Sequence, residues 1–341
     1  MKNSLPIIAV VTQTTRLAGL KSRWVTSKAA AFRIQHAAVH EVERRRKRAF
    51  HAGKSKEFDE QAVALAVDAL YDQDEYFDEH QIYESAIETL LDEIDLGYPI
   101  KEIDRGFVTN FDFGRCVAVV VIGRDGLVAN TAKYVGDLPI IGVNPDPTRN
   151  DGVLLPYTIE QARTAVQRVL KNRATFKTVT LAEVNTNDGQ RMLAFNDFYV
   201  GAKTHVSARY SLEYADEIEA QSSSGIIIAT GAGSTGWLSS VFNMNRGINR
   251  ALNIDAEGRI QMEWDDRRLF WAVREPFVSR HSSAEYVAGY LDTEKELVVG
   301  SQMTGNGVIF SDGIESDFIE FNAGTIARFF PSTQRANLVV G

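Results

Sequence analysis

Three short segments place carboxylate, amide or hydroxyl side chains where they could bind and react with a phosphate. The first is Gly123-Arg124-Asp125-Gly126, which directly follows the apolar run Val117 to Ile122. Its glycines would let a phosphate approach the backbone. The Asp125 carboxylate could accept a proton from an attacking hydroxyl or help to hold Mg²⁺. Asp-Gly is also a common turn sequence, so the loop taken alone is better explained as an ordinary turn.

The second segment is a glycine-rich turn that follows the apolar run Ile226 to Ala229. We expect a buried strand, then the turn, then a helix from about Thr235 to Phe242 that Ser234 caps. Free N–H groups at a helix N-terminus, together with hydroxyls, favour a bound phosphate. Glycines alone fit a plain turn, and the hydroxyls favour the phosphate site. The candidate ligand residues are Thr230, Gly231, Gly233, Ser234, Thr235, Gly236 and Trp237.

The third segment is the pair Asn196-Asp197, after an apolar strand over Met192 to Phe195. An amide beside a carboxylate can hydrogen-bond a ribose diol or an adenine edge, but a polar pair at a strand end fits the spacing equally well. Asp312-Gly313 is interpreted as a hairpin turn. Histidines and cysteine form no cluster with metal-ligand spacing, and His205 and His281 are isolated.

A parallel sheet would position the first segment. Ile7 to Thr12, Val117 to Ile122 and Pro139 to Val143 are short runs rich in β-branched residues, which predict buried strands. A helix over Leu127 to Tyr134 would complete a βαβ unit. Its loop would lie at the carboxyl edge of the sheet, where open α/β sheets bind ligands.

Helices fill most of the remaining N-terminal half. We expect a polar turn over Thr12 to Arg16, then helices over Lys28 to His51, capped by Ser27, and over Glu57 to Leu70. A third helix, Asp74 to Ile94, would bury four apolar residues at helical spacing. A capping box at Thr158 to Gln161 predicts a helix to about Lys171. The four apolar residues are Ile82, Ala86, Leu90 and Ile94.

From about Thr175 the chain changes to short strands and turns, which predicts a β-rich second domain. Val179 to Val184 and Met192 to Val200 would form a hairpin around Asn187 to Gln190. We therefore expect an α/β Rossmann-like domain over residues 1–172 and a β-rich domain after it. Further strands are expected at Ile260 to Trp264, Leu269 to Arg274, Leu297 to Gly300, Val308 to Ser311, Phe318 to Phe321 and Thr325 to Phe330.

Composition narrows the function classes. The 341 residues are 44% hydrophobic and 24% charged, as in an ordinary globular protein. A net charge of −8 argues against general nucleic-acid binding. The single cysteine, Cys116, excludes an intramolecular disulfide, and the run Leu5 to Val11 is too short to span a membrane. We expect a cytoplasmic protein that binds neither nucleic acid nor membrane.

The three segments, in this order and spacing, resemble the motifs of the NAD kinase family. That family has a Gly-Gly-Asp-Gly loop, an Asn-Glu pair and a glycine-rich Gly-Ser-Thr segment. The resemblance extends from about Val117 to the C-terminus. It implies a β-sandwich-like second domain over residues 173–327, with the tail 328–341 returning to the first domain.

The resemblance also implies roles. Asp125 would be the catalytic base that deprotonates the 2′-hydroxyl of the adenosine ribose of NAD, with ATP and Mg²⁺ as the phosphate donor. The dinucleotide would contact Asn196 and Asp197, and Thr235 to Ser240 would line the same site. The family implies a homodimer or tetramer. The implied cofactor-binding residues are Gly123, Arg124, Gly126, Asn196, Asp197, Thr230, Gly231, Gly233, Ser234, Thr235, Gly236, Trp237 and Ser240.

Several positions depart from the family pattern. Arg124 replaces a glycine, Asp197 stands for a glutamate, and Ser224 takes the place of an aspartate. An arginine at 124 could itself contact phosphate. The forms Ser223-Ser224-Gly225 and Thr230 to Ser234, with Trp237 and Asn243 to Arg246, are more similar to the mitochondrial-type NAD kinases.

Three alternatives stay open. A non-catalytic nucleotide sensor on a kinase-like fold would explain Arg124 and Ser224. A related kinase could act on a lipid or sugar hydroxyl. An oxidoreductase is the third alternative, because Gly231 to Gly236 satisfies G-x-G-x-x-G after a strand, with Asp255 about twenty residues on. That motif lies in the β-rich half, with no clear βαβ continuation, and a Walker lysine is absent.

Overall fold

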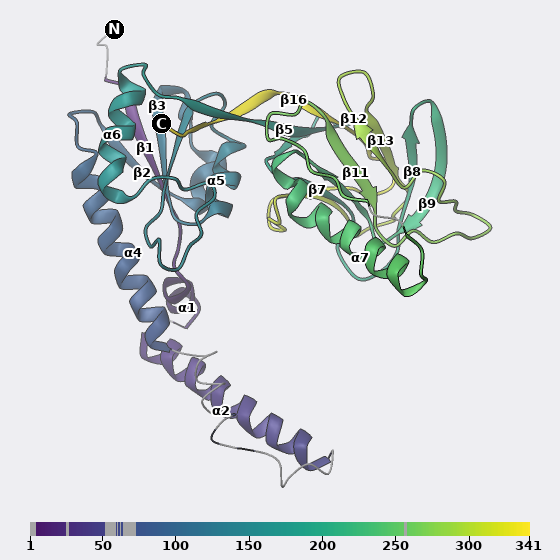
Figure 1. Cartoon of the computed structure of the whole chain (residues 1–341), viewed down its shortest axis with the longest axis horizontal. Helices are drawn as coiled ribbons and strands as arrows, with labels where there is room; N and C mark the ends of the chain where they lie inside the picture. Colours follow the sequence, from purple (N-terminus) through teal and green to yellow (C-terminus); the bar gives the residue numbers. More distant parts are fainter. Residues whose placement is uncertain are drawn as a thin grey trace.

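The computed structural model describes residues 5–24, 27–51, 59, 61, 63, 73–255 and 258–341. Its strands form two sheets, one of which runs from an α/β half into a β-rich half (Figure 1). This architecture confirms the predicted α/β plus β-rich fold class. No helix in the described part of the chain combines the length and apolar character needed to cross a membrane.

The α/β half is built on four parallel strands in the order β2 (Ile100–Asp104), β1 (Ile7–Thr12), β3 (Cys116–Ile122), β4 (Pro139–Val143). Successive β1 side chains alternate between two cores, so both faces of this sheet are buried. Helix α5 (Asp125–Ala132) packs on one face, and α4 (Gln73–Glu93) and α6 (Ile159–Leu170) pack on the other.

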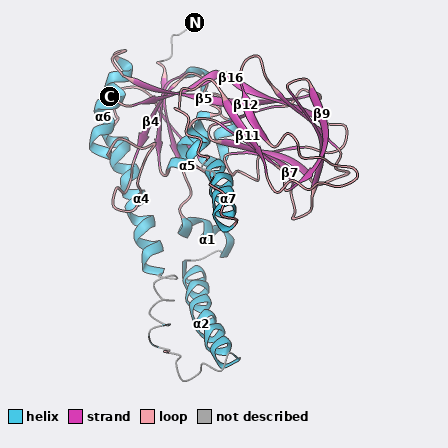
Figure 2. Ribbon diagram, turned by 45° about the vertical axis from the view of Figure 1, so that its right-hand side comes forward, coloured by secondary structure: helices cyan, strands magenta, loops and turns pink. Residues whose placement is uncertain are grey.

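Strand β16 (Ile326–Val339) connects the two halves. Its end pairs in parallel with β4, and its beginning pairs antiparallel with β13 (Leu297–Ser301). Strand β5 (Phe176–Thr186) pairs along β16, so two long strands cross from one half to the other (Figure 2). The same sheet continues through β8 (Ala208–Tyr214) to β9 (Glu217–Ser223).

The second sheet is antiparallel and lies wholly in the β-rich half. Its strands are β12 (Ala288–Leu291), β11 (Leu269–Val273), β10 (Ile226–Ala229), β7 (Asp197–Ala202), β14 (Gly307–Ser311) and β15 (Phe318–Glu320), in that order. Buried rings fill the space between this sheet and the first one, among them Phe198, Tyr210, Trp271 and Phe329. Helix α7 (Trp237–Ala251) follows β10.

Several predicted elements differ from those observed. Helix α1 (Arg16–Trp24) begins at the end of the predicted polar turn and leads to α2 (Ser27–His51), which extends away from both sheets (Figures 1 and 2). The predicted helix over 57–70 lies largely outside the described residues. Ala86 and Leu90 of α4 and Ile94 just after it are buried as expected, but Ile82 is 40% exposed.

Two strand predictions in the β-rich half are wrong. Met192 to Val200 is two strands, β6 (Arg191–Ala194) and β7, because the chain changes sheets at Phe195 and Asn196. Ile260 to Trp264 is not a strand. Its polar backbone atoms bond elsewhere: Met262 N–H donates to the Ser234 hydroxyl, and Trp264 C=O accepts from Thr180 N–H.

Candidate functional site

Asp125 is the first residue of α5, immediately after β3 and its loop. Its carboxylate accepts hydrogen bonds from two backbone N–H groups, those of Leu154 at 2.7 Å and Val153 at 3.3 Å. A side chain at Gly123 would approach the ends of the Leu127 and Gln13 side chains at 2.9 Å and 3.1 Å, so a larger residue there would make both of them shift. The half-buried carboxylate is therefore held at the carboxyl edge of the sheet.

Arg124 does not disturb this loop. Its backbone is extended, with φ −112° and ψ 162°, so the position does not require a glycine. The side chain reaches α4, where Nη2 lies 2.9 Å from Glu79 Oε1. The departure from the family pattern at this position therefore adds a cation without changing the path of the backbone.

Asp312 fixes the predicted Asn196-Asp197 pair. Its fully buried carboxylate accepts hydrogen bonds from the N–H groups of Phe195 at 3.1 Å, Asn196 at 2.6 Å and Asp197 at 3.4 Å. Lys133, directly after α5, places Nζ 3.5 Å from Asp312 and donates to Ser311 Oγ at 2.8 Å. One carboxylate thus ties the helix that begins with Asp125 to the point where β6 becomes β7.

The electrostatics of this cluster follow from burial. Burial, reinforced by the negative charge of Asp312, raises the pKa of Asp197 to about 7. Burial also raises the pKa of Asp312 and lowers the pKa of Lys133, in each case opposed by the attraction between the two groups. Sequence reasoning interpreted Asp312 as a turn residue and did not single out Lys133. The sequence held one signal for Asp312: an Asp-Gly pair directly after a buried strand, similar to the Asp-Gly pair at Asp125.

The glycine-rich turn packs against Asn196. A side chain at Gly233 would lie 2.1 Å from Asn196 O, and one at Gly231 would lie 1.8 Å from Glu263 O. The Thr230 hydroxyl donates to Phe195 O at 2.6 Å and accepts from Gly233 N–H at 3.2 Å. These contacts make the turn a rigid support for the Asn196 backbone.

The predicted Ser234 cap is wrong. Ser234 is buried, its hydroxyl donates to Gly231 O at 2.7 Å, and α7 begins two residues later than expected, at Trp237. The N–H groups of Gly233, Ser234 and Gly236 also bond within the turn. Of the predicted hydroxyls, those of Thr235 and Ser240 belong to exposed residues, and Ser240 donates to Trp237 O at 2.6 Å.

Trp237 belongs to an aromatic cavity of about 510 Å³. Its ring stacks on Tyr199 with centroids 5.7 Å apart and an interplanar angle of 11°, and Phe310 lies 5.0 Å from Tyr199. The Arg274 guanidinium lies 5.4 Å from the Trp237 centroid. Flat rings beside a cation suit a planar ligand with a negative group. Ser224 also lines this cavity, whereas sequence reasoning did not identify Tyr199, Phe310 or Arg274.

A larger cavity of about 850 Å³, here the central cavity, lies between the two halves. Gly126 and Asn130 of α5 form part of its wall, and Asp312 to Asp317 of the β-rich half form another part. Tyr134 hydrogen-bonds Asp317 beside it. The structure therefore brings the 123–126 loop to Asp312 and, through Asp312, to Asn196. It places the glycine-rich turn against Asn196, with Trp237 on the aromatic cavity.

Comparisons with known proteins agree on one family. No family model matches the chain. It is 29% identical over 147 residues to an NAD kinase of Chlorobium luteolum and 28% identical over 127 residues to one of Chlorobium phaeobacteroides. These matches cover 42% and 36% of this chain, and 47% and 44% of the relatives, so the chain spans less than half the length of the curated relatives it matches.

Solved structures show the same likeness in three dimensions. A yeast NADH kinase complexed with NADH has a TM-score of 0.55 at 15% identity, and the match covers 100% of this chain and 84% of that one. An NAD kinase from Archaeoglobus fulgidus in complex with ATP has a TM-score of 0.52 at 17% identity, covering 76% and 89%. The predicted resemblance to NAD kinases is confirmed, and the fold is theirs.

Proposed function

We propose that this chain, whose fold and sequence likeness are those of the NAD kinase family, transfers the terminal phosphate of ATP to NAD. The acceptor is the 2′-hydroxyl of the adenosine ribose, and the product is NADP. The single observation that carries the proposal is the Asp125 carboxylate. Two backbone N–H groups fix it at the carboxyl edge of the sheet, next to Gly126 on the wall of the central cavity.

In the reaction one proton is transferred, one bond to phosphorus forms and one breaks. Asp125 accepts the proton of the 2′-hydroxyl, and the ribose oxygen attacks the terminal phosphorus. The bond from that phosphorus to its bridging oxygen breaks, and ADP leaves with the electron pair. A positioned base contributes about 10²–10⁴-fold to such a step, and positioning and charge neutralisation supply most of the rest.

Mg²⁺ would neutralise the charge that develops on the phosphates. Among the described residues, no three His, Cys, Asp or Glu side chains lie close enough to hold a metal ion together. That arrangement suits an ion bound through the donor phosphates with at most a carboxylate such as Asp125, as is usual for Mg²⁺ in phosphoryl transfer.

The dinucleotide would be held by Asn196, which Asp312 fixes, and by residues at and after the glycine-rich turn. Asn196 has its backbone N–H bonded to Asp312 and its backbone C=O bonded to Thr230, so its backbone is fixed and its side-chain amide would make the adenine or ribose contact. Thr235, Trp237 and Ser240 would contact the dinucleotide beyond it. The buried Thr230, Gly231, Gly233 and Ser234 would act by supporting the turn. We propose a homo-oligomer for the assembled enzyme.

The test incubates the purified chain with ATP, Mg²⁺ and NAD and measures NADP. Steady formation of NADP supports the proposal. A second function, a non-catalytic nucleotide sensor, is favoured by one observation, the Arg124–Glu79 pair beside the reactive loop. Tight nucleotide binding in calorimetry without any NADP would establish that sensor and refute the kinase. A lipid or sugar hydroxyl that is phosphorylated in place of NAD would also contradict the proposal.

A further inference from the structure

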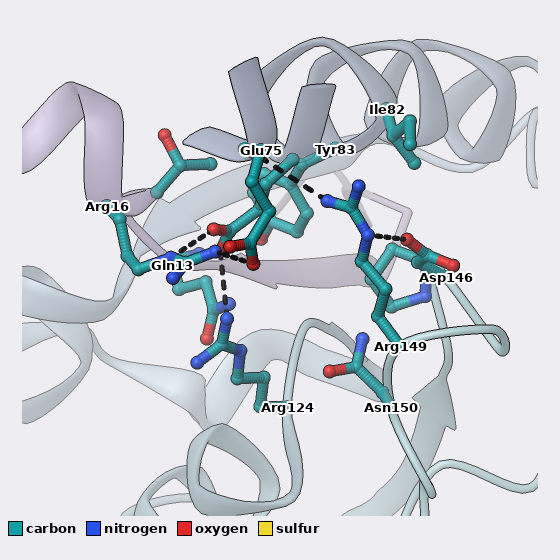
Figure 3. A pocket seen from close by; sticks show the side chains of 12 residues that line it. Gln13, Arg16, Glu75, Ile82, Tyr83, Arg124, Asp146, Arg149 and Asn150 are labelled. Carbon is teal, nitrogen blue, oxygen red and sulfur yellow. Dashed lines mark hydrogen bonds and ion pairs between the residues drawn. The ribbon is translucent and has the colours of Figure 1, made fainter. Parts of the chain in front are cut away.

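A second cavity, of about 520 Å³, lies under the N-terminal part of α4 and is here called the arginine cavity. Three arginines from three different segments line it: Arg16 at the start of α1, Arg124 of the reactive loop, and Arg149 after β4 (Figure 3). Guanidinium groups make planar, bidentate contacts that match phosphate oxygens. The convergence of three of them therefore needs an explanation.

Carboxylates of α4 occupy the space between these arginines. Arg16 Nη2 lies 2.8 Å from Glu75 Oε1, and its Nε bonds Glu79. Glu79 also bonds Arg124 at 2.9 Å. Arg149 donates to the backbone oxygen of Glu75 at 3.4 Å and lies 3.6 Å from Asp146 (Figure 3). The cavity wall is therefore electrically balanced, with three cations against three carboxylates.

These pairs can exchange. The side chains of Arg16, Arg124 and Arg149 are 38%, 54% and 35% exposed, so water screens their ion pairs and each contributes little to stability. The helix itself is anchored by Tyr83, whose hydroxyl donates to Ile122 O at 2.8 Å and accepts from Gln13 N–H at 2.9 Å. Displacing the carboxylates of Glu75, which is 41% exposed, and of Glu79, which is 15% exposed, therefore does not require α4 to move.

The arginine cavity adjoins the central cavity. Gln13, Arg16, Glu79 and Arg124 line both. The Arg124–Glu79 ion pair thus lies between the central cavity, which Gly126 lines, and the arginine cavity. A ligand held by the arginines would direct one end toward the loop of Asp125.

We propose that Arg16, Arg124 and Arg149 bind a linear phosphoanhydride chain, and that the carboxylates of Glu75 and Glu79 take its place when it is absent. The inference rests on the proposed phosphate transfer at the same loop and names the part of the donor that this chain grips. The chemistry is shared by the triphosphate of ATP and by inorganic polyphosphate. A bound phosphoanhydride must displace the Glu79 carboxylate. Glu79 therefore weakens its binding, and the arginines strengthen it.

The test measures binding by calorimetry on the full chain, at fixed ionic strength, with inorganic tripolyphosphate and separately with ATP. We expect R124Q and R149Q each to weaken tripolyphosphate binding about tenfold, since each loses a charge-assisted contact. E79Q should tighten it several-fold. The matched controls are R163Q on α6 and E88Q on the exposed face of α4, which change the same charges outside the cavity and should leave binding unchanged.

The outcomes separate the inference from the proposed function. Equal losses for ATP and tripolyphosphate support a site that reads the phosphate chain. A loss for ATP with no tripolyphosphate binding overturns it, as does an effect of R163Q equal to that of R124Q. If the wild type makes NADP but no arginine variant alters binding or the KM for donor, the inference fails and the kinase stands. If tripolyphosphate binds through the arginines but no NADP forms, the kinase fails and the site stands. Unchanged melting temperatures exclude misfolding as the cause.

Discussion

Two buried carboxyl groups, Asp197 and Asp312, lie side by side where the chain leaves β6 and enters β7 in the other sheet. Asp312 has a cation and three N–H donors as partners, whereas Asp197 has a neighbouring negative charge. Such unequal surroundings drive the pKa values of neighbouring acids away from their solution values. Asp197, which stands where the NAD kinase pattern has a glutamate, is therefore costly to ionise.

The first prediction concerns Asp197→Asn. The folded pKa of Asp197, about 7, lies above the ordinary aspartate value of 3.8, so between these two pH values the folded chain binds a proton that the unfolded chain has lost. Its stability should therefore fall as the pH rises from about 4 to about 7. The asparagine variant lacks this loss and should be more stable than wild type by roughly 4 kcal/mol at pH 8, with little difference near pH 4. Urea unfolding at both pH values measures it, and an equal difference at both would contradict the account.

At the scale of elements, the glycine-rich turn and the start of β7 form one unit. The turn presents bare backbone to Asn196, and the Thr230 hydroxyl bonds the backbone on either side of that contact. This unit fixes the position of the Asn196 backbone, and it does not present its own backbone amides to a ligand.

The second prediction is that Gly233→Ala destabilises the chain and lowers activity. The added Cβ would lie 2.1 Å from Asn196 O, and backbone cannot move aside as a flexible side chain can. We expect a loss of about 3 kcal/mol in the free energy of unfolding, together with weaker dinucleotide binding. Gly247→Ala in α7 is the control, since nothing lies within 4 Å of its Cβ and alanine favours a helix. Equal stability of the two variants would refute the packing argument.

These elements show what a sequence can and cannot predict. Ile7–Thr12, Pro139–Val143 and Ile226–Ala229 were predicted to the residue, because runs that are apolar on both faces form strands without help from distant residues. The split between β6 and β7 was missed because the partner that bonds the backbone there, Asp312, lies more than a hundred residues away. The strands that precede the three motif segments were predicted, but the bonding of Ser234 depends on a distant backbone N–H, that of Met262.

At the scale of the whole molecule, two kinds of connection join the halves. Strands β5 and β16 pair along their length and cross between them (Figure 1). At the central cavity, Lys133 and Tyr134, the two residues after α5, reach Ser311, Asp312 and Asp317. The strands keep the halves together, and the polar contacts set α5 relative to the β-rich half.

The third prediction is that Lys133 and Asp312 act as a pair. Both side chains are 2% exposed, so Lys133→Met leaves the Asp312 carboxyl buried without its cation. We expect a loss of about 3 kcal/mol in stability and a fall in kcat, since α5 loses its link to the Asn196 segment. Asp312→Asn alone should also destabilise the chain, and the double variant should lose less than the sum of both. Strict additivity in chemical denaturation would show that the two residues do not interact.

The most direct test of the central claim is the turnover of Asp125→Asn beside wild type, with ATP, Mg²⁺ and NAD, and with nucleotide binding measured on the same samples. The account predicts that kcat falls at least a hundredfold, because the amide cannot take the ribose proton, while the Kd for NAD changes little. A variant that makes NADP at the wild-type rate would show that the Asp125 carboxylate is not the base, and would contradict the mechanism proposed at the central cavity.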